Sequence, residues 1–182
     1  MTGNPWTTLA SEIKYDNPWI RVTEHQVIHP NGQPGIYGVV GFKGRAVGVV
    51  PYEDGHIWMV GQYRYPLEQY SWEIPEGGSS PDEDTADTAR RELREETGLT
   101  AGSLVSLFEM HLSNSATDEW AIVYLARDLV QGESAPEASE ALHVRRMSLD
   151  EVYAEVEARR ITDSMTVAAV YKLMLMRARG EL

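Results

Sequence analysis

The chain has 182 residues, of which 42% are hydrophobic and 24% are charged. A chain of this length forms about one globular domain, and this composition excludes collagen, coiled coil and intrinsic disorder. Acidic residues outnumber basic residues by 28 to 16, and the resulting formal charge of -12 disfavours a nucleic-acid partner.

The sequence contains no cysteine, which excludes disulfides and Cys-ligated zinc. Its five histidines are scattered along the chain, and we expect surface or hydrogen-bonded side chains rather than metal ligands. No apolar run reaches the length that spans a membrane, and residues 1–19 do not resemble a signal peptide. We therefore expect a cytoplasmic protein with no membrane contact.

Strands dominate the first half of the chain. Alternating or apolar runs bounded by turn residues predict strands at about residues 20–28, 36–42, 46–51 and 57–65. The dipeptides Asn31-Gly32 and Asp54-Gly55 predict hairpin turns between them. Further strands are predicted at about residues 71–74, 104–111, 120–127 and 142–146.

One helix with well-marked ends interrupts these strands. Ser80 and Glu83 have the spacing of a capping box, and Pro81 suits the first helical position. Gly98 suits the left-handed residue after the last turn. The sequence therefore predicts a helix over about residues 81–97.

Two further helices are predicted near the C-terminus. Ser148 and Glu151 form a second capping box, which predicts a helix to about Arg159. Asp163 is a suitable cap for a last helix that reaches about Arg179. The fold class expected from these elements is α+β, with a mixed sheet flanked by helices.

Acidic side chains share one face of the first helix. Glu92, Glu95 and Glu96 have the spacing i, i+3, i+4, which places them on one arc of about 100°. Arg91 reaches Glu95 at i+4 but neutralises only part of this charge. A solvated acidic face is the plain interpretation of such an arc. A hard divalent cation, Mg²⁺ above all, is the alternative that oxygen ligands favour.

The flanking residues decide between these interpretations. Counting from Gly77, the order is five residues, Glu83, seven residues, Arg91-Glu92-Leu93, one residue, Glu95-Glu96, one residue and Gly98-Leu99. This pattern resembles the signature of the Nudix hydrolases. The resemblance implies a Nudix fold, an α/β/α sandwich, and metal-dependent cleavage of a nucleoside diphosphate linked to another group. Residues 46–182 would form this domain, and residues 1–45 an N-terminal unit with a β-hairpin.

The resemblance also implies roles for these residues. Glu92 and Glu96, together with Glu95, would bind Mg²⁺, with Mn²⁺ as the alternative ion. The backbone carbonyl of Glu76 would be a further ligand. Glu95 and Arg91 would belong to the catalytic group, in which Arg91 orients the carboxylates. For Glu83 we prefer the capping box to a catalytic role.

Two upstream segments, Gln62–Pro66 and Trp72–Gly78, are similar to those of ADP-ribose and nucleoside diphosphate sugar pyrophosphatases. In that branch Arg64 would bind a substrate phosphate, for which its paired donors are suited. The alternative for Arg64 is a salt bridge at a strand end. Trp72 would stack on a base, although strand aromatics also pack against cores.

One segment departs from the branch. ADP-ribose pyrophosphatases carry a Ser-Pro-Gly-like turn after the signature, whereas this chain has Ser113–Glu119 without a proline. The departure favours a broader nucleoside diphosphate sugar preference over ADP-ribose alone. Glu119 and Asp118 would accept hydrogen bonds from sugar hydroxyls, and a solvated turn is the alternative.

The last expected role is that of a base or a further metal ligand. The stretch Glu140–Val144 resembles the Glu-x-(Ile/Leu)-x-Val context of a catalytic loop, and Glu140 is our choice. Glu133 and Glu137 are the alternatives. Related proteins are commonly homodimers in which N-terminal strands help to build the partner's site.

The function expected is metal-dependent hydrolysis of a nucleoside diphosphate sugar, of the ADP-ribose, ADP-glucose or GDP-mannose type, to a nucleoside monophosphate and a sugar phosphate. Two alternatives remain open. One is hydrolysis of a modified nucleoside triphosphate or a dinucleoside polyphosphate. The other is a non-catalytic nucleotide-binding module, which the retained Glu92, Glu95 and Glu96 disfavour.

Overall fold

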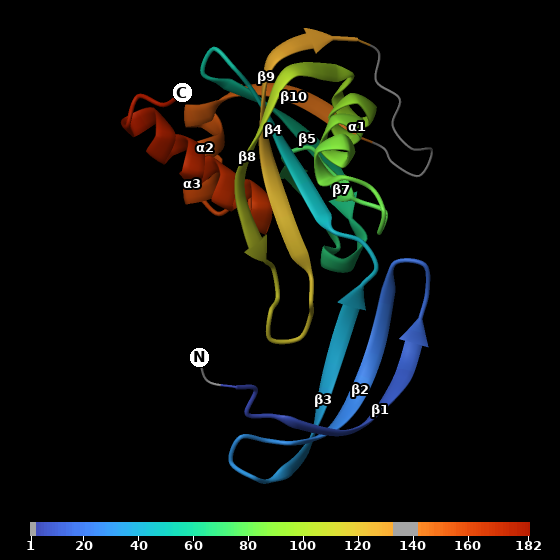
Figure 1. The fold of residues 1–182 in the computed structure, drawn as a ribbon. Coiled ribbons are helices and arrows are strands. Elements are labelled where there is room, and N and C mark those ends of the chain that lie inside the picture. Colours follow the sequence, from blue (N-terminus) through green and yellow to red (C-terminus); the bar gives the residue numbers. More distant parts are fainter. Residues whose placement is uncertain (1–2, 133–141) are drawn as a thin grey trace.

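The computed structural model describes residues 3–132 and 142–182, whose strands form two separate sheets (Figure 1). The N-terminal sheet is antiparallel in the order β1-β2-β3, with β1 at Thr7–Asp16, β2 at Ile20–Ile28 and β3 at Pro34–Phe42. The predicted hairpin is β2 and β3, and Gly32 in its turn has a φ of 83°. The sequence analysis missed β1, because no residue of that strand is buried.

The main sheet is mixed, as predicted. Its path runs β10-β5-β4-β9-β8, with β6 beside β5 and β7 beside β4. Strands β4 and β9 are parallel, and the other pairs are antiparallel. The strands are β4 (Ala46–Glu53), β5 (His56–Arg64), β6 (Gln69–Glu73), β7 (Glu76–Gly78), β8 (Leu99–His111), β9 (Trp120–Gln131) and β10 (His143–Ser148), with a 3₁₀ turn at Tyr65–Leu67.

Asp54 and Gly55 join β4 to β5 with positive φ angles of 47° and 76°. Positive φ at both central residues is the requirement of a type I′ hairpin turn, so the dipeptide predicted this connection correctly.

Helices cover both faces of the main sheet (Figure 1). Helix α1 (Thr85–Thr97) packs on one face, and α2 (Leu149–Glu157) with α3 (Ser164–Ala178) packs on the other. Alternate residues of β9 serve the two cores: Val123 packs towards α2 and α3, whereas Ile122 packs towards α1. The expected α/β/α sandwich is confirmed.

Helix α1 begins later than predicted. Its N-cap is Asp84, whose carboxylate accepts the Ala86 N–H at 2.8 Å. Ser80 and Glu83 instead form a turn before the helix, in which the Ser80 N–H donates to Glu83 Oε2 at 3.2 Å. The end was predicted correctly, since Gly98 caps the helix with a φ of 74°.

The two C-terminal helices begin where their caps predict. Ser148 and Glu151 form a complete capping box at α2. Asp163 Oδ2 accepts the Thr166 N–H at 2.7 Å at the start of α3. Thr166 Oγ1 in turn accepts the N–H of Ile74 at 2.9 Å, which fastens α3 to the segment between β6 and β7.

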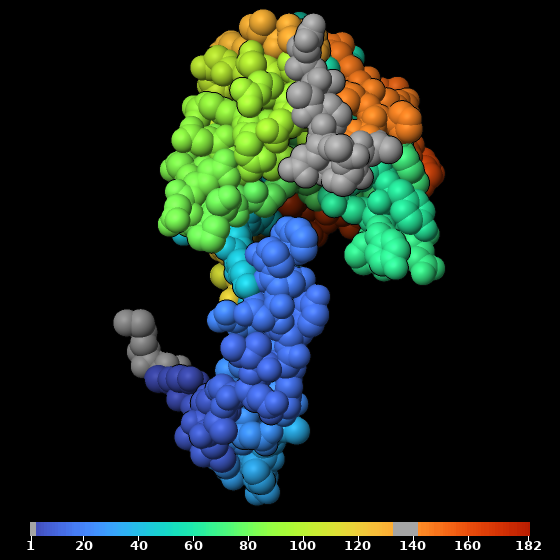
Figure 2. Space-filling model, turned by 90° about the vertical axis from the view of Figure 1, so that its right-hand side faces the viewer, coloured from blue at the N-terminus to red at the C-terminus, as the bar shows by residue number. Residues whose placement is uncertain are grey.

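The N-terminal sheet projects from the main body (Figures 1 and 2). The loop between β8 and β9 holds it in place: the Val40 N–H donates to the Ala116 carbonyl at 2.9 Å, and the Phe42 N–H donates to Asp118 Oδ1 at 2.8 Å. None of the helices in the described ranges has the length and hydropathy needed to cross a bilayer.

Candidate active site

A cleft of about 1210 Å³ lies where the N-terminal sheet meets the main body, and Figure 2 shows the hollow there. Its lining combines the end of β3, the end of β5, strand β7, helix α1 and the start of α3. Six of the predicted site residues line it: Arg64, Glu76, Arg91, Glu92, Glu95 and Glu119.

Gly77 allows the acidic helix to approach the loop before it. A Cβ atom at this position would lie 2.1 Å from Oε1 of Glu92. A side chain at position 77 would therefore displace the carboxylate of Glu92 from its place beside the backbone of β7. The first glycine of the signature therefore has a steric role in placing Glu92 on the cleft wall.

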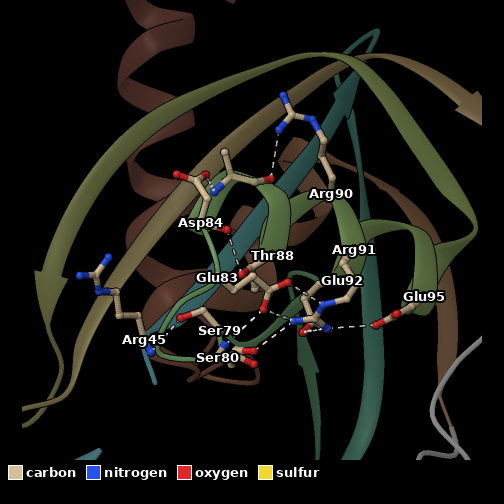
Figure 3. Close-up of polar contacts among 12 residues, drawn as sticks. Arg45, Ser79, Ser80, Glu83, Asp84, Thr88, Arg90, Arg91, Glu92 and Glu95 are labelled. Carbon is tan, nitrogen blue, oxygen red and sulfur yellow. Dashed lines mark hydrogen bonds and ion pairs between the residues drawn. The ribbon is translucent and has the colours of Figure 1, made fainter. Parts of the chain in front are cut away.

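Arg91 organises the carboxylates of α1 (Figure 3). Its guanidinium donates to Glu92 at 2.7 Å, to Glu95 at 3.1 Å and to Glu83 at 3.0 and 3.2 Å. A further bond to the Gly78 carbonyl, at 3.1 Å, ties the helix to the preceding loop. The hydrogen bonds from Arg91 hold the pKa of Glu83 below its ordinary value.

Glu96 lies behind the loop rather than in the cleft lining. The residue is 3% exposed, and its Oε2 accepts the backbone N–H of Glu76 at 3.0 Å. This bond holds the peptide before Gly77 against α1. Of the three carboxylates on this face of the helix, those of Glu92 and Glu95 therefore line the cleft, whereas that of Glu96 is buried behind the loop and binds its backbone.

Arg64 forms a salt bridge at the end of β5. Its guanidinium donates to both oxygens of Glu73, at distances from 2.5 to 3.0 Å, and to Glu76 Oε1 at 2.7 Å. The ion pair that the sequence analysis gave as the alternative for Arg64 is therefore present, although Arg64 also lines the cleft. Burial raises the pKa of the Glu76 carboxyl well above its ordinary value, and the neighbouring carboxylates of Asp163 and Glu73 raise it further.

Sequence reasoning missed Glu73 and Asp163 as site residues. Their carboxylate oxygens and one of Glu76 lie within 4.8 Å of one another. The sequence pattern indicates only a helix cap for Asp163 and only a place in a motif for Glu73. The signal available in the sequence was Glu73 between the apolar residues Trp72 and Ile74, because a carboxylate in a buried segment needs a partner.

The structure places the other predicted residues as follows. Trp72 packs against the main core with Arg145 5.4 Å over its ring, and Asp118 accepts the Phe42 N–H, so neither belongs to the cleft lining. Glu119 does line the cleft, and burial, then the charge of Asp118, raises its pKa. Glu140 lies outside the described residues.

Comparison with known proteins identifies two segments. Residues 42–165 match the NUDIX domain, and residues 6–40 match the nucleoside diphosphate sugar hydrolase N-terminal domain. The chain is 33% identical over 173 residues to an ADP-ribose pyrophosphatase of Bacillus subtilis (strain 168) and to a methanol dehydrogenase activator of Bacillus methanolicus. Each match covers 94% of this chain and 94% of the relative.

A crystal structure of an ADP compounds hydrolase superposes with a TM-score of 0.88 at 22% identity, and the match covers 100% of both chains. That likeness confirms the fold. The sequence match over residues 42–165, together with the glutamates of α1 at the cleft, shows that the chain belongs to the Nudix hydrolase family.

Proposed function

We propose that this protein hydrolyses the diphosphate of nucleoside diphosphate sugars to a nucleoside monophosphate and a sugar phosphate, with a divalent cation. The observation that carries the proposal is one cleft lined by both Arg64 and the carboxylates of α1. The full-length similarity to an ADP-ribose pyrophosphatase supports this substrate class. So does the match of residues 6–40 to the N-terminal domain of nucleoside diphosphate sugar hydrolases.

The residues present fit a hard cation. Glu92 and Glu95 bring oxygen donors to the cleft wall, and Arg91 pairs with both of them and with Glu83. Oxygen-only donor sets favour Mg²⁺ or Mn²⁺. We propose Mg²⁺ held by Glu92, Glu95 and Glu96, with the Glu76 carbonyl. When bound, this cation supplies positive charge to the diphosphate and lowers the pKa of water.

The chain's own groups then act on substrate and water. Arg64 donates to an oxygen of the diphosphate, and Glu119 accepts a hydrogen bond from a sugar hydroxyl. Water attacks one phosphorus, the bridging P–O bond breaks, and the departing phosphate takes the electron pair. Glu140 is the proposed acceptor of the water's proton, on sequence context alone, with Glu133 and Glu137 as the alternatives.

We also propose that two copies of the chain form a homodimer through their N-terminal sheets. Large apolar side chains are exposed on this sheet and the turn beside it: Leu9, Ile13, Tyr15, Trp19 and Ile36. Exposed apolar groups gathered on one small unit are typical of an interaction surface. In the proposed dimer, the N-terminal unit of one copy, residues 1–45, contributes to the substrate site in residues 46–182 of the other copy. The cytoplasmic location stays a prediction.

A phosphate-release assay tests the substrate class. Wild-type protein is incubated with ADP-ribose, ADP-glucose, GDP-mannose or UDP-glucose, in Mg²⁺ or in EDTA, with excess alkaline phosphatase. Intact sugar nucleotides resist the phosphatase, and their cleavage products do not. We expect Mg²⁺-dependent release from one or more of them. If no sugar nucleotide releases phosphate but 8-oxo-dGTP releases pyrophosphate, the protein would be a hydrolase of modified nucleoside triphosphates instead.

A further inference from the structure

A second group of carboxylates meets in the cleft wall, apart from the acidic face of α1. Glu73 ends β6, Glu76 begins β7, and Asp163 caps α3. One oxygen from each lies within 4.8 Å of the others, and all three residues line the cleft. Two neighbouring strand ends and the start of a helix far along the chain therefore bring three oxygen donors together.

The charge of this group is only partly balanced. Arg64 pairs with Glu73 and Glu76, whereas the contact recorded for Asp163 Oδ2 is with the neutral Thr166 N–H. The side chains of Glu73 and Glu76 are 3% and 11% exposed, so water screens them poorly. Because buried carboxylates need an opposite charge close by, this group favours the binding of a further cation.

One oxygen of the group is unsatisfied. Glu76 Oε1 accepts from Arg64, but Glu76 Oε2 is buried and has no hydrogen-bond partner in the described part of the chain. Buried polar atoms are paired in the great majority of cases, and each exception points to a missing partner such as an ion. One oxygen of this carboxylate lies within 4.8 Å of oxygens of Glu73 and Asp163, and the buried Oε2 without a hydrogen-bond partner among the described residues belongs to the same carboxylate.

The donors are held in place before any ligand arrives. Asp163 is fixed by its cap bond to Thr166, and Thr166 Oγ1 accepts the N–H of Ile74 at 2.9 Å. Ile74 lies between Glu73 and Glu76 in the chain, so this pair of bonds ties the segment that carries two of the carboxylates to the third. Preformed donors of this kind favour binding, because little ordering remains to be done.

We propose that Glu73, Glu76 and Asp163 bind a hard divalent cation of the Mg²⁺ or Mn²⁺ class, in addition to the cation on α1. Carboxylate oxygens without nitrogen or sulfur donors suit this class of ion. The site deepens the proposed function, because its ligands line the cleft proposed for the diphosphate. Its occupancy does not require that any particular nucleotide be cleaved.

The test counts bound Mn²⁺ on the full-length protein without nucleotide, by electron paramagnetic resonance of the free ion. Asp163→Asn is the main variant, since asparagine caps a helix as well as aspartate does and the fold is kept. Asp84→Asn is the matched control, because Asp84 caps α1 in the same way and does not line the cleft. We expect Asp163→Asn to lose one Mn²⁺ and Asp84→Asn to match the wild type.

Glu76→Gln provides a second variant and should lose the same ion. An anomalous difference peak between Glu73, Glu76 and Asp163 in a Mn²⁺-soaked crystal would locate it. Unchanged Mn²⁺ binding in both Asp163→Asn and Glu76→Gln would overturn the proposal, and a proton would then occupy the cluster. A loss of bound Mn²⁺ in these variants would support the cation site even if the protein hydrolyses no sugar nucleotide. The cation site and the proposed hydrolysis are therefore tested independently.

Discussion

Two strands show how differently the two sheets are stabilised. In β4 of the main sheet, Val47, Val49 and Val50 are fully buried, because helices cover both faces. In β1 of the N-terminal sheet all ten residues are exposed, and Val27 of β2 is the buried hydrophobic residue among the described parts of that sheet. The main body forms its own core, whereas the N-terminal sheet relies on its hydrogen-bond ladder and on contacts beyond it.

Truncating a leucine in each region is the strongest test of this contrast. Leu173 of α3 is 0% exposed, and Leu173→Ala should lower the free energy of unfolding by about 2–5 kcal/mol through lost burial and a cavity. Leu9 of β1 is 61% exposed, and Leu9→Ala should change the free energy of unfolding by less than about 0.5 kcal/mol. Urea unfolding at a low protein concentration measures both. Equal losses of unfolding free energy in the two variants would contradict this difference between the main body and the N-terminal sheet.

A charge introduced on the N-terminal sheet should weaken the association of two copies of the chain and leave the folding of each copy unchanged. Ile13→Glu places a carboxylate on the exposed apolar surface of β1 and should weaken the proposed dimer about tenfold or more, which corresponds to about 1.4 kcal/mol. Leu175→Glu, on the exposed side of α3, is the control and should leave association unchanged. Sedimentation velocity over a range of concentrations gives the answer. A wild-type protein that is monomeric throughout would refute the dimer.

The junction between the two regions should open more easily than the core of the main body. Asp118→Ala removes the acceptor of the Phe42 N–H, a bond worth about 1 kcal/mol. Amide hydrogen exchange should accelerate at Phe42 and at Val40, while the amides of β9 keep their protection. If exchange in β9 rose equally, the sheet and the body would unfold as one unit.

The smallest expected effect is a pH dependence of the N-terminal sheet. Asp16 is hydrogen-bonded to Lys43 and to Arg21, and these contacts lower its pKa from 3.8. A lowered folded-state pKa adds stability that is present above the unfolded value and is lost as the pH falls through the folded value. Exchange at the β2 amides should therefore accelerate only below about pH 4. Asp16→Asn should abolish that dependence.

Local patterns predicted much of the catalytic helix and its surroundings. The spacing of Glu92, Glu95 and Glu96 predicted their common face, and Asp54-Gly55 predicted the hairpin turn, because these features depend on neighbouring residues alone. The start of α1 was misplaced, since Asp84 and not Ser80 caps the helix by accepting the Ala86 N–H.

The sequence alone could not predict the cluster of Glu73, Glu76 and Asp163. It depends on α3 docking against the segment between β6 and β7, through the bond from Ile74 to Thr166. Such a contact joins residues far apart in the chain, and no local periodicity encodes it. Strand β1 was missed for a related reason: its stability comes from pairing with β2, not from an apolar face.

We propose that the glutamates of α1 support metal-dependent hydrolysis in this cleft. The most direct test compares Glu96→Gln with Glu109→Gln, a control at an exposed position on β8. Glutamine at position 96 keeps an acceptor for the Glu76 N–H but removes the charge. With ADP-ribose and Mg²⁺, we predict a loss of turnover of about a hundredfold or more in Glu96→Gln only. Wild-type turnover in Glu96→Gln would show that hydrolysis in this cleft does not need the Glu96 carboxylate.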